Sequence, residues 1–411
     1  MAKNTQHHEP FTRGRPTVLT KPSPPSIMDR LMWAVPFVSL TVIALTLLRP
    51  DPQVPQPGSS RIVTDMLGRQ VHIALPFKGV AVTWFALATN YLSETGSPAD
   101  IVTMGTSERS VLTRSMLGKI FPGLVAKDSI WNIRQIAYGR GPNAEVETLL
   151  AFKEPGVFLG GYRMVPVFER VGLPAAALTW DDKNRDVTLI GRAKLHTAIS
   201  GNPERGEALI DRYWQAFRAL EQELQPATLT RRPQVLYMAS MTENKQYLVY
   251  WNKVDPFNVY FPRAGMENAI PDASVVVSPD AERILLTDPD LIFLQDSPFI
   301  PNRQSPKEFM ADPRWQGMKA VASKRVYRLP VAHPVDMRWI DLMPVMVRLM
   351  AELAHPERLR PTVRTMLRDY IFQDFGYRMS EDEIDAALKM DENGESAGFE
   401  RFTRDYEKRS S

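Results

Sequence analysis

A helix–proline–strand unit that occurs twice is the feature that most limits how this chain can fold. Residues 281–295, AERILLTDPDLIFLQ, predict a short amphipathic helix, a turn at Asp288-Pro289-Asp290 and a buried strand, because the residue before a proline is pushed out of the helical region. Residues 147–160, ETLLAFKEPGVFLG, repeat this order. One unit in each half predicts two lobes of similar α/β construction, and a cleft between lobes is a natural ligand site.

Length and composition narrow the class of protein. The chain has 411 residues, which is too many for one ordinary core and suits two lobes with additional segments. Its formal net charge is +3, and no basic stripe with interleaved aromatic residues occurs, so nucleic acid is not an expected partner. There is no cysteine, which excludes disulfides, thiolate metal sites, cysteine nucleophiles and a lipid anchor on cysteine.

The N-terminal region predicts attachment to a membrane. Residues 1–30 are polar and proline-rich and predict a disordered cytoplasmic tail. Residues 31–48 form an uncharged apolar run, and about 18 residues is close to the minimum that crosses a bilayer. The positive charges before the run predict that the N-terminus is inside. An uncleaved transmembrane signal-anchor is favoured over a cleaved signal peptide, because the tail is long and no Ala-x-Ala pattern follows. Residues 49–60 predict a proline-rich linker.

The remaining chain predicts an α/β fold, with two Rossmann-like lobes joined by a long spine helix. In residues 61–185, the N-terminal lobe, a hairpin around residues 66–68 precedes alternating strands and helices, which favours a mostly parallel sheet. Residues 186–225 predict the linking helix from apolar side chains at helical spacing, with an interruption at Gly201-Asn202-Pro203. Tyr213, Trp214 and Phe217 fit its core face better than a ligand face.

The second lobe and a helical tail follow the spine. Residues 226–355 predict the C-terminal lobe, which opens with a strand at residues 234–238. Residues 356–411 predict a helical tail, in which the capping box at residues 380–383 begins a helix that runs to about Met390. After Asp391 the chain is polar, so it is expected to fray.

Six segments in order resemble the substrate-binding proteins of ABC importers for iron–siderophore, haem and cobalamin, which are periplasmic binding proteins with a helical backbone. The resemblance covers residues 61–355 and rests on the order more than on any single motif. Three departures are Glu154 before Pro155, Met266 after Gly265, and the absence of the lipobox cysteine. The segments are TDMLGRQVHIALP at 64–76, ETLLAFK at 147–153, residues 191–213, AGMEN at 264–268, residues 282–294, and residues 312–327 with DPRW and VY.

The resemblance implies that one exposed glutamate on each lobe docks against arginines of an ABC permease dimer. The matching positions are Glu147 and Glu282. A second interpretation is that each glutamate is a helix-start carboxylate favoured by the helix dipole. The two interpretations are compatible, because a first-turn glutamate is also a rigid, exposed anion.

The resemblance also places the ligand in loops that follow the carboxyl ends of the strands. Arginine binds anionic oxygens bidentately, tyrosine and tryptophan contact planar apolar surfaces, and tyrosine or histidine can ligate iron. Taken singly, each aromatic residue is more often a core residue than a site residue. Arg140 and Arg163, beside glycines, and His333 are the strongest candidates. The predicted ligand-binding residues are Trp84, Tyr138, Arg140, Tyr162, Arg163, Trp251, His333, Arg338 and Trp339.

A bare metal ion is not expected as the ligand, because zinc or manganese needs a cage of histidines and carboxylates. The histidines of the folded region are His72, His196, His333 and His355, and they fall in unrelated elements. Catalysis is not expected either, since Gly-x-Ser-x-Gly, His-Glu-x-x-His, P-loop and Gly-x-Gly-x-x-Gly motifs are absent.

These expectations combine into one functional hypothesis and one alternative. The protein would capture a metal chelate, first a ferric siderophore and otherwise haem or cobalamin, and present it to an ABC permease dimer on the extracytoplasmic (periplasmic) side of the cell membrane. It would hold no intrinsic cofactor. The alternative is a membrane-tethered receptor, chaperone or partner-binding protein that keeps the fold without transport.

Overall fold

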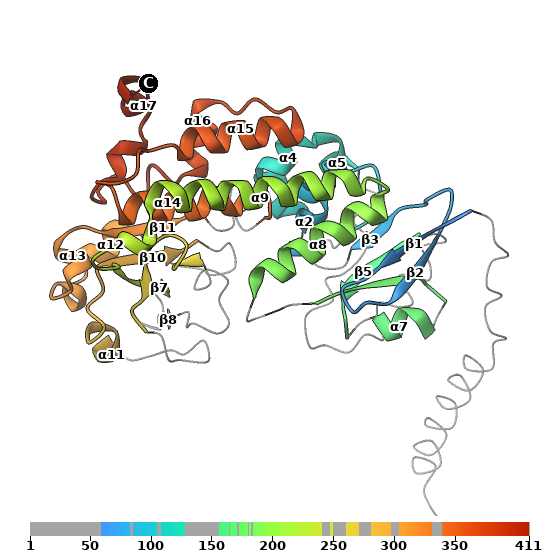
Figure 1. Ribbon diagram of the computed structural model, residues 1–411, viewed down its shortest axis with the longest axis horizontal. Coiled ribbons are helices and arrows are strands. Elements are labelled where there is room, and N and C mark those ends of the chain that lie inside the picture. Colours follow the sequence, from blue (N-terminus) through green and yellow to red (C-terminus); the bar gives the residue numbers. More distant parts are fainter. Residues whose placement is uncertain are drawn as a thin grey trace, which may run out of the picture. The chain divides into compact units, whose positions relative to one another are not determined.

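The computed structural model divides the chain into two units, Met1–Gln56 and Pro57–Ser411. Figure 1 shows the elements of the second unit. The residues that the structure describes all lie in the second unit, and no helix among them is long and apolar enough to cross a membrane. The predicted membrane segment, residues 31–48, lies outside this part. The described residues are 59–82, 85–104, 108–127, 156–163, 165–170, 172–179, 181, 184–240, 247–249, 260–270, 281–296, 304–330 and 339–410.

The N-terminal lobe begins with the predicted hairpin, in which β1 (Ser60–Thr64) pairs antiparallel with β2 (Gln70–Ala74). Asp65 organises its turn, because the carboxylate accepts hydrogen bonds from the backbone of Leu67 and Arg69. It also accepts one from the backbone nitrogen of Ala177, a strand residue of the sheet described next. A parallel sheet of order β4-β3-β5-β6 follows. Its strands are β3 (Val80–Val82), β4 (Ile101–Thr103), β5 (Val157–Gly161) and β6 (Ala175–Leu178).

Helices connect and cover these strands, as the alternating pattern predicted. Phe158 of β5 stacks on Phe168 of the helix at residues 165–170, with ring centroids 3.5 Å apart. This helix and the sheet face therefore share a core. The helices are α2 (Phe85–Thr95), α3 (Glu108–Arg114), α4 (Met116–Ile120), α5 (Pro122–Ala126) and α7 (Val165–Arg170).

The spine is two helices, α8 (Arg185–Ser200) and α9 (Pro203–Leu224), that meet at the predicted interruption. Gly201 ends α8 with φ of 86°, a left-handed conformation that suits glycine. The Asn202 side chain then accepts a hydrogen bond from the backbone of Arg205 and begins α9. The apolar stripe is buried as its spacing predicted, through Leu209, Tyr213, Phe217, Leu220 and Leu224.

The C-terminal lobe contains a five-stranded sheet of order β11-β10-β7-β8, with β9 beside β7. The pairings of β7, β10 and β11 are parallel, whereas β8 is antiparallel to β7. The 281–295 unit is confirmed as α11 followed by β10; of the 147–160 unit, only the strand β5 lies in the described part. The strands are β7 (Gln234–Ser240), β8 (Tyr247–Val249), β9 (Glu267–Asn268), β10 (Leu291–Gln295) and β11 (Val326–Leu329).

Short helices surround this sheet, and Trp315, fully buried, stacks on Phe309 in the core beneath them. β11 and α14 follow these short helices at the end of the lobe. The helices are α11 (Ala281–Leu285), α12 (Pro306–Ala311), α13 (Lys319–Ala322) and α14 (Met343–Ala354), with 3-10 turns η2 (Pro226–Thr228) and η3 (Pro313–Trp315).

The C-terminal region corrects one prediction. The capping box is confirmed, because the Ser380 hydroxyl accepts from the Glu383 backbone while the Glu383 side chain accepts from that of Ser380. The expected fraying after residue 391 is wrong, since Asn393 is fully buried and Phe399 and Phe402 are each 1 % exposed. These rings give the polar stretch an apolar anchor that its average composition concealed. The elements are α15 (Val363–Phe375), α16 (Glu381–Ala387), η4 (Phe399–Phe402) and α17 (Arg404–Ser410).

Candidate functional site

An arginine–tyrosine pair lies at the carboxyl end of β5, where the resemblance places ligand contacts. Tyr162 is 46 % exposed. The Arg163 Nε donates a hydrogen bond of 3.1 Å to the Tyr162 hydroxyl, and the guanidinium carbon is 5.6 Å from the centroid of the ring. The pair therefore presents a positive charge and an aromatic face together at the end of a buried strand.

Trp339 corrects the predicted set of ligand residues. Its side chain is 2 % exposed and belongs to the large hydrophobic core, so it is a core residue in this structure and not part of an open ligand surface. Its neighbour Ile340 is fully buried as well. Trp339 is buried because it packs in this apolar core. The other predicted ligand residues lie outside the described part: Trp84, Tyr138, Arg140, Trp251, His333 and Arg338.

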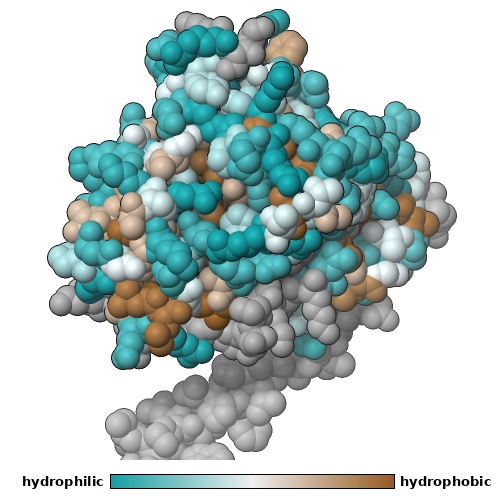
Figure 2. Space-filling model, turned by 60° about the vertical axis from the view of Figure 1, so that its left-hand side comes forward, coloured by the Kyte–Doolittle hydropathy of each residue, from teal (hydrophilic) through white to brown (hydrophobic). Residues whose placement is uncertain are grey.

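Of the two predicted docking glutamates, Glu282 is described and Glu147 is not. Glu282 is the second residue of α11 and is exposed, as both interpretations of its role require. Leu286, just after the helix, is 80 % exposed. The face in Figure 2 is mostly hydrophilic, and its apolar side chains form separate groups.

A polar cluster around Asp186 joins the spine to the C-terminal lobe. The Asp186 carboxylate accepts hydrogen bonds from the hydroxyls of Tyr213 and Tyr260 and from both terminal nitrogens of Arg263. Burial, together with the Asp186 charge, raises the pKa of Tyr260, and burial likewise raises the pKa of Tyr213, so both phenols stay neutral. Nothing in the local sequence signalled this cluster, because its members come from α8, α9 and the segment before β9.

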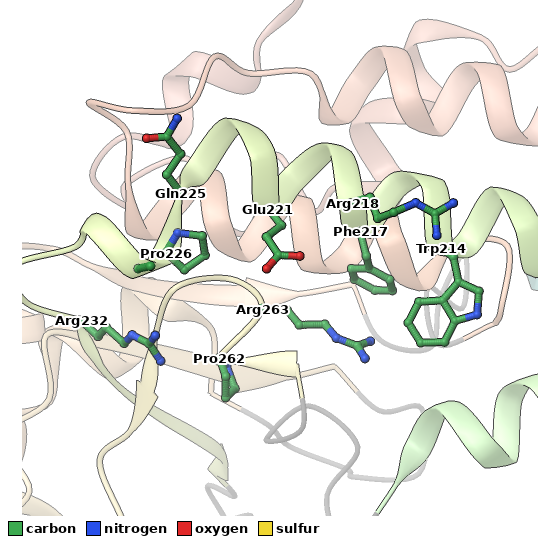
Figure 3. A pocket seen from close by; sticks show the side chains of 10 residues that line it. Trp214, Phe217, Arg218, Glu221, Gln225, Pro226, Arg232, Pro262 and Arg263 are labelled. Atoms are coloured by element: carbon green, nitrogen blue, oxygen red, sulfur yellow. The ribbon is translucent and has the colours of Figure 1, made fainter.

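Arg263 also lines a groove beside the spine (Figure 3). The groove has a volume of about 710 Å³. One wall lies beside the buried stripe of α9 and consists of Trp214, Arg218 and Glu221, at helical spacing, followed by the C-cap residue Gln225. The guanidinium carbon of Arg263 is 4.6 Å from the Phe217 ring centroid. The other wall includes Pro226, Ala227, Arg232, Pro262 and Arg263.

The groove is not the predicted cleft. Arg232 lies just before β7, which begins at Gln234, so the groove is near the amino end of that strand, whereas ligands of open α/β sheets bind at carboxyl ends. Its lining has three arginines and one glutamate, and this positive balance suits an anion.

A second polar cluster is entirely internal. Glu94 of α2 contacts Arg192 Nε at 2.7 Å and His196 Nδ1 at 2.6 Å, and all three side chains are at most 2 % exposed. Burial opposes ionisation of Glu94, but Arg192 and His196 outweigh it and lower its pKa. Burial and the Arg192 charge lower the pKa of His196, so we assign the charge balance to Arg192 and Glu94. This cluster is structural, since no ligand can reach it.

Three of the four histidines of the folded region are described, and they lie in separate elements. His72 lies in β2 on the hairpin, His196 is in α8, and His355 contacts the Gly265 carbonyl oxygen at 3.1 Å. Within the described ranges, no group of three or more histidine and carboxylate side chains is placed to hold a metal ion.

Comparison with known proteins agrees with this architecture. The family model described as "Periplasmic binding protein" matches residues 181–332, which include the spine and most of the C-terminal lobe. No curated protein sequence matches the chain closely enough to add a further relative.

Solved structures share the fold at low sequence identity. A periplasmic solute binding protein from Veillonella parvula is similar with a TM-score of 0.69 and 21 % identity, over 82 % of this chain and 99 % of that one. The molybdate-bound MolA of Haemophilus influenzae gives 0.61 and 17 %, over 78 % and 99 %. The petrobactin-binding protein YclQ of Bacillus subtilis gives 0.55 and 13 %, over 72 % and 99 %. Residues 181–332 therefore match the periplasmic binding protein family model, and the chain shares with these solved structures a fold of two α/β lobes joined by a helical spine.

Proposed function

We propose that this protein captures a metal chelate, most favourably a ferric siderophore, between its two lobes and presents it to an ABC permease dimer. The observation that carries the proposal is the Tyr162–Arg163 pair at the end of β5. A guanidinium fixed against a phenol suits an anionic ligand that also has planar or apolar surface. Ferric siderophore complexes have this combination, and haem and cobalamin are the second candidates.

The ligands named for proteins of similar fold include petrobactin and molybdate. These ligands differ in size and chemistry, so the fold alone does not select one. An anion as small as molybdate needs no aromatic surface, whereas the exposed ring of Tyr162 provides such a surface beside the cation. This difference is why we favour an organic chelate over a bare oxyanion.

The proposal includes the protein's surroundings. Glu282, exposed in the first turn of α11, and Glu147 would face the permease, one from each lobe. The lobes would stand outside the cytoplasm, tethered by residues 31–48 through the linker at 49–60. A tethered protein that binds only a partner protein is the alternative, and binding of a chelate distinguishes the two.

The test is calorimetric titration of the purified full-length protein with ferric citrate, the iron(III) complex of 2,3-dihydroxybenzoate, a ferric hydroxamate, haem and cobalamin. We expect saturable binding of one iron chelate. Arg163→Ala should weaken it by about tenfold to a hundredfold, because a hydrogen bond to a charged group contributes roughly 1.5–3 kcal/mol.

Two further variants show whether the ligand binds at the Tyr162–Arg163 pair or in the groove beside α9. Arg170→Ala removes an exposed arginine from α7 in the same lobe and should leave affinity unchanged. Arg232→Gln removes a cation from the groove beside α9. Loss of binding in Arg232→Gln but not in Arg163→Ala would move the ligand to the groove. Absence of binding to every chelate would overturn the proposal.

A further inference from the structure

The C-terminal segment, residues 363–410, contacts both lobes and the spine. This segment comprises α15, α16, η4 and α17. Figure 1 shows α15 and α16 beside the spine helix α9, with α4 and α5 of the N-terminal lobe at one end of them. The contacts fall into four groups, each with a different consequence.

The first group reaches the N-terminal lobe. Lys119 of α4 forms an ion pair of 2.8 Å with Glu383 of α16. Phe121, between α4 and α5, meets Phe375 of α15 edge to face, with ring centroids 6.0 Å apart. An ion pair and an aromatic pair therefore attach the segment to the lobe that contains β5 and the Tyr162–Arg163 pair.

The second group reaches the spine. Arg212 of α9 donates to both oxygens of the Asp374 carboxylate, at 2.6 and 2.5 Å. Its guanidinium carbon is also 4.9 Å from the Tyr370 ring centroid. Both hydrogen bonds come from the same nitrogen, Nη2. Charge-assisted hydrogen bonds are stronger than neutral ones, so this pair ties α15 to α9.

The third group covers the edge strand of the C-terminal lobe. Asn393 accepts a hydrogen bond of 2.7 Å from the backbone nitrogen of Arg328 and donates one of 3.0 Å to its carbonyl oxygen. Ser396 donates to the Val326 carbonyl oxygen at 2.5 Å. Side chains of the segment thus occupy the unpaired edge of β11, where another strand would otherwise pair.

The fourth group reaches the carboxyl end of β10. Arg328 of β11 donates to the carbonyl oxygens of Gln295, at 2.5 Å, and Gln304, and its Nε is 3.0 Å from Glu392 of the segment. Lys389 forms an ion pair of 2.7 Å with Asp296, which is 1 % exposed and directly follows β10. The segment therefore binds the carboxyl end of β10, and ligands of open α/β sheets bind at the carboxyl ends of strands.

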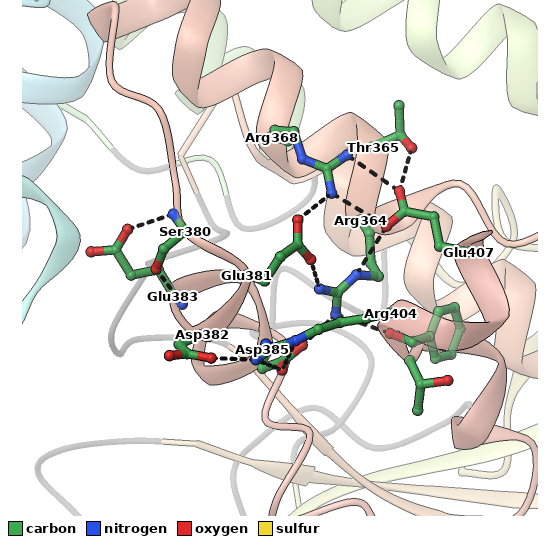
Figure 4. Close-up of polar contacts among 12 residues, drawn as sticks. Arg364, Thr365, Arg368, Ser380, Glu381, Asp382, Glu383, Asp385, Arg404 and Glu407 are labelled. Carbon is green, nitrogen blue, oxygen red and sulfur yellow. Dashed lines mark hydrogen bonds and ion pairs between the residues drawn. The ribbon is translucent and has the colours of Figure 1, made fainter. Parts of the chain in front are cut away.

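The segment is itself tied together by charges (Figure 4). Arg364 of α15 is 3 % exposed and pairs with Glu381, Asp385 and Glu407. Arg368 pairs with Glu381 at 2.9 Å and with Glu407 at 3.2 Å. These carboxylates come from α16 and α17. The ion pairs therefore hold α15, α16 and α17 together as one unit.

We propose that residues 363–410 are a second bridge between the lobes, which limits their relative motion and positions the end of β10 through Arg328 and Lys389. The bridge function stands independently of any ligand. The positioning of a ligand contact rests on the proposed function.

The bridge is tested by the distance between the lobes in the full-length protein. The chain has no cysteine, so Arg170→Cys on α7 and Ala322→Cys at the end of α13 provide two sites for nitroxide spin labels. Double electron–electron resonance then measures the distance between the labels. Both positions are exposed. The parent should give one narrow distance distribution. Lys119→Met combined with Phe121→Ala should broaden or shift it, and Phe375→Ala, from the other side of the same contact, should do likewise.

Lys127→Met is the matched control, since it removes an exposed lysine just after α5 and should leave the distribution narrow. Circular dichroism confirms that each variant is folded. An unchanged distribution in both the double variant and Phe375→Ala would overturn the bridge.

The positioning role is tested by backbone hydrogen exchange across residues 291–306 without ligand. Lys389→Met should raise the exchange rate there by about tenfold, whereas Lys307→Met, which removes the exposed pair with Glu395, should not. Because Lys389→Met removes an ion-pair partner of the buried Asp296, Lys389→Met with Asp296→Asn is the second variant, and the same faster exchange is expected. Unchanged exchange in both variants would overturn positioning.

Titration with the iron(III) complex of 2,3-dihydroxybenzoate separates the two proposals. If no chelate binds while the distances and exchange rates respond, the proposed function fails and the bridge stands. If the chelate binds and neither measurement responds, the bridge fails and the proposed function stands.

Discussion

The spine and the C-terminal segment both connect the two lobes, but they do so with charges in different surroundings. Two spine residues, Arg192 and His196 of α8, form a cluster with Glu94 of α2, and all three side chains are almost completely removed from solvent. The C-terminal segment attaches to the N-terminal lobe through Lys119 and Glu383, which keep 53 % and 14 % of their side chains exposed. A broken buried pair leaves an uncompensated charge, whereas an exposed pair is screened by water. The spine should therefore determine whether the fold forms, and the segment should adjust how its lobes sit.

The largest effect is expected from breaking the buried cluster of the spine. Arg192→Met removes the arginine that compensates the fully buried Glu94 carboxyl, and should lower the free energy of unfolding by about 3–5 kcal/mol. Urea denaturation measures it. Arg192→Met with Glu94→Gln removes both charges and should recover most of the loss. A loss below about 1 kcal/mol in the single variant would contradict the buried-charge account.

A pH-dependent effect is expected at Asp341, which accepts a hydrogen bond of 2.8 Å from Ser93 of α2. Burial, followed by the charge of Asp374, raises the pKa of Asp341 to about 7, although Arg212 and Arg205 oppose the shift. The folded state therefore binds this proton more tightly than the unfolded state. The resulting stabilisation is present below about pH 4, the pKa of an unfolded aspartate, and is lost as the pH rises through about 7.

Asp341→Asn should therefore gain stability relative to the parent as the pH increases from 4 to 8, on the order of 4 kcal/mol for a shift of about three pKa units. Thermal melts of both proteins across this range measure the difference. Asp211→Asn on the exposed face of α9 is the control, and its difference from the parent should stay flat. A constant difference for Asp341→Asn would show that this carboxyl titrates normally.

An intermediate effect is expected where the C-terminal segment covers β11. Asn393→Ala leaves the Arg328 backbone nitrogen and carbonyl oxygen without their present partner, which should cost roughly 2–3 kcal/mol. Chemical denaturation measures the loss, and Asp391→Ala, at an exposed neighbouring position, should have little effect. Equal stability of the two variants would mean that the edge finds other partners.

The smallest effect compares two capping boxes with the same geometry. Ser305 begins α12 in the C-terminal lobe and Ser380 begins α16 in the segment, and each hydroxyl accepts from the third helical residue at 3.2 Å. Replacing either serine by alanine should cost about 1 kcal/mol. A much smaller loss for Ser380→Ala in thermal denaturation would show that α16 is held by its ion pairs rather than by its cap.

Features set by residues that are neighbours in the sequence were predicted correctly, whereas features set by contacts between distant residues were not. The interruption of the spine was predictable, because Gly201, Asn202 and Pro203 act on adjacent backbone. The Tyr162–Arg163 pair was also accessible, since both residues follow an apolar run beside a glycine. Trp339 was misassigned, because a tryptophan near a strand end has the same local pattern whether it faces a ligand or the core.

The sequence by itself determined the local elements: two α/β lobes, a broken spine helix and capped helices, each set by neighbouring residues and by apolar periodicity. Only the tertiary structure decided which charges meet. Glu94 and Arg192 are 98 residues apart, and Arg328 and Asn393 are 65 apart. No local pattern encodes such pairs, because the sequence around a buried, paired polar residue is the same in kind as that around a solvated one in a helix or turn. Its role as a buried partner arises when packing removes water and leaves one other group within reach.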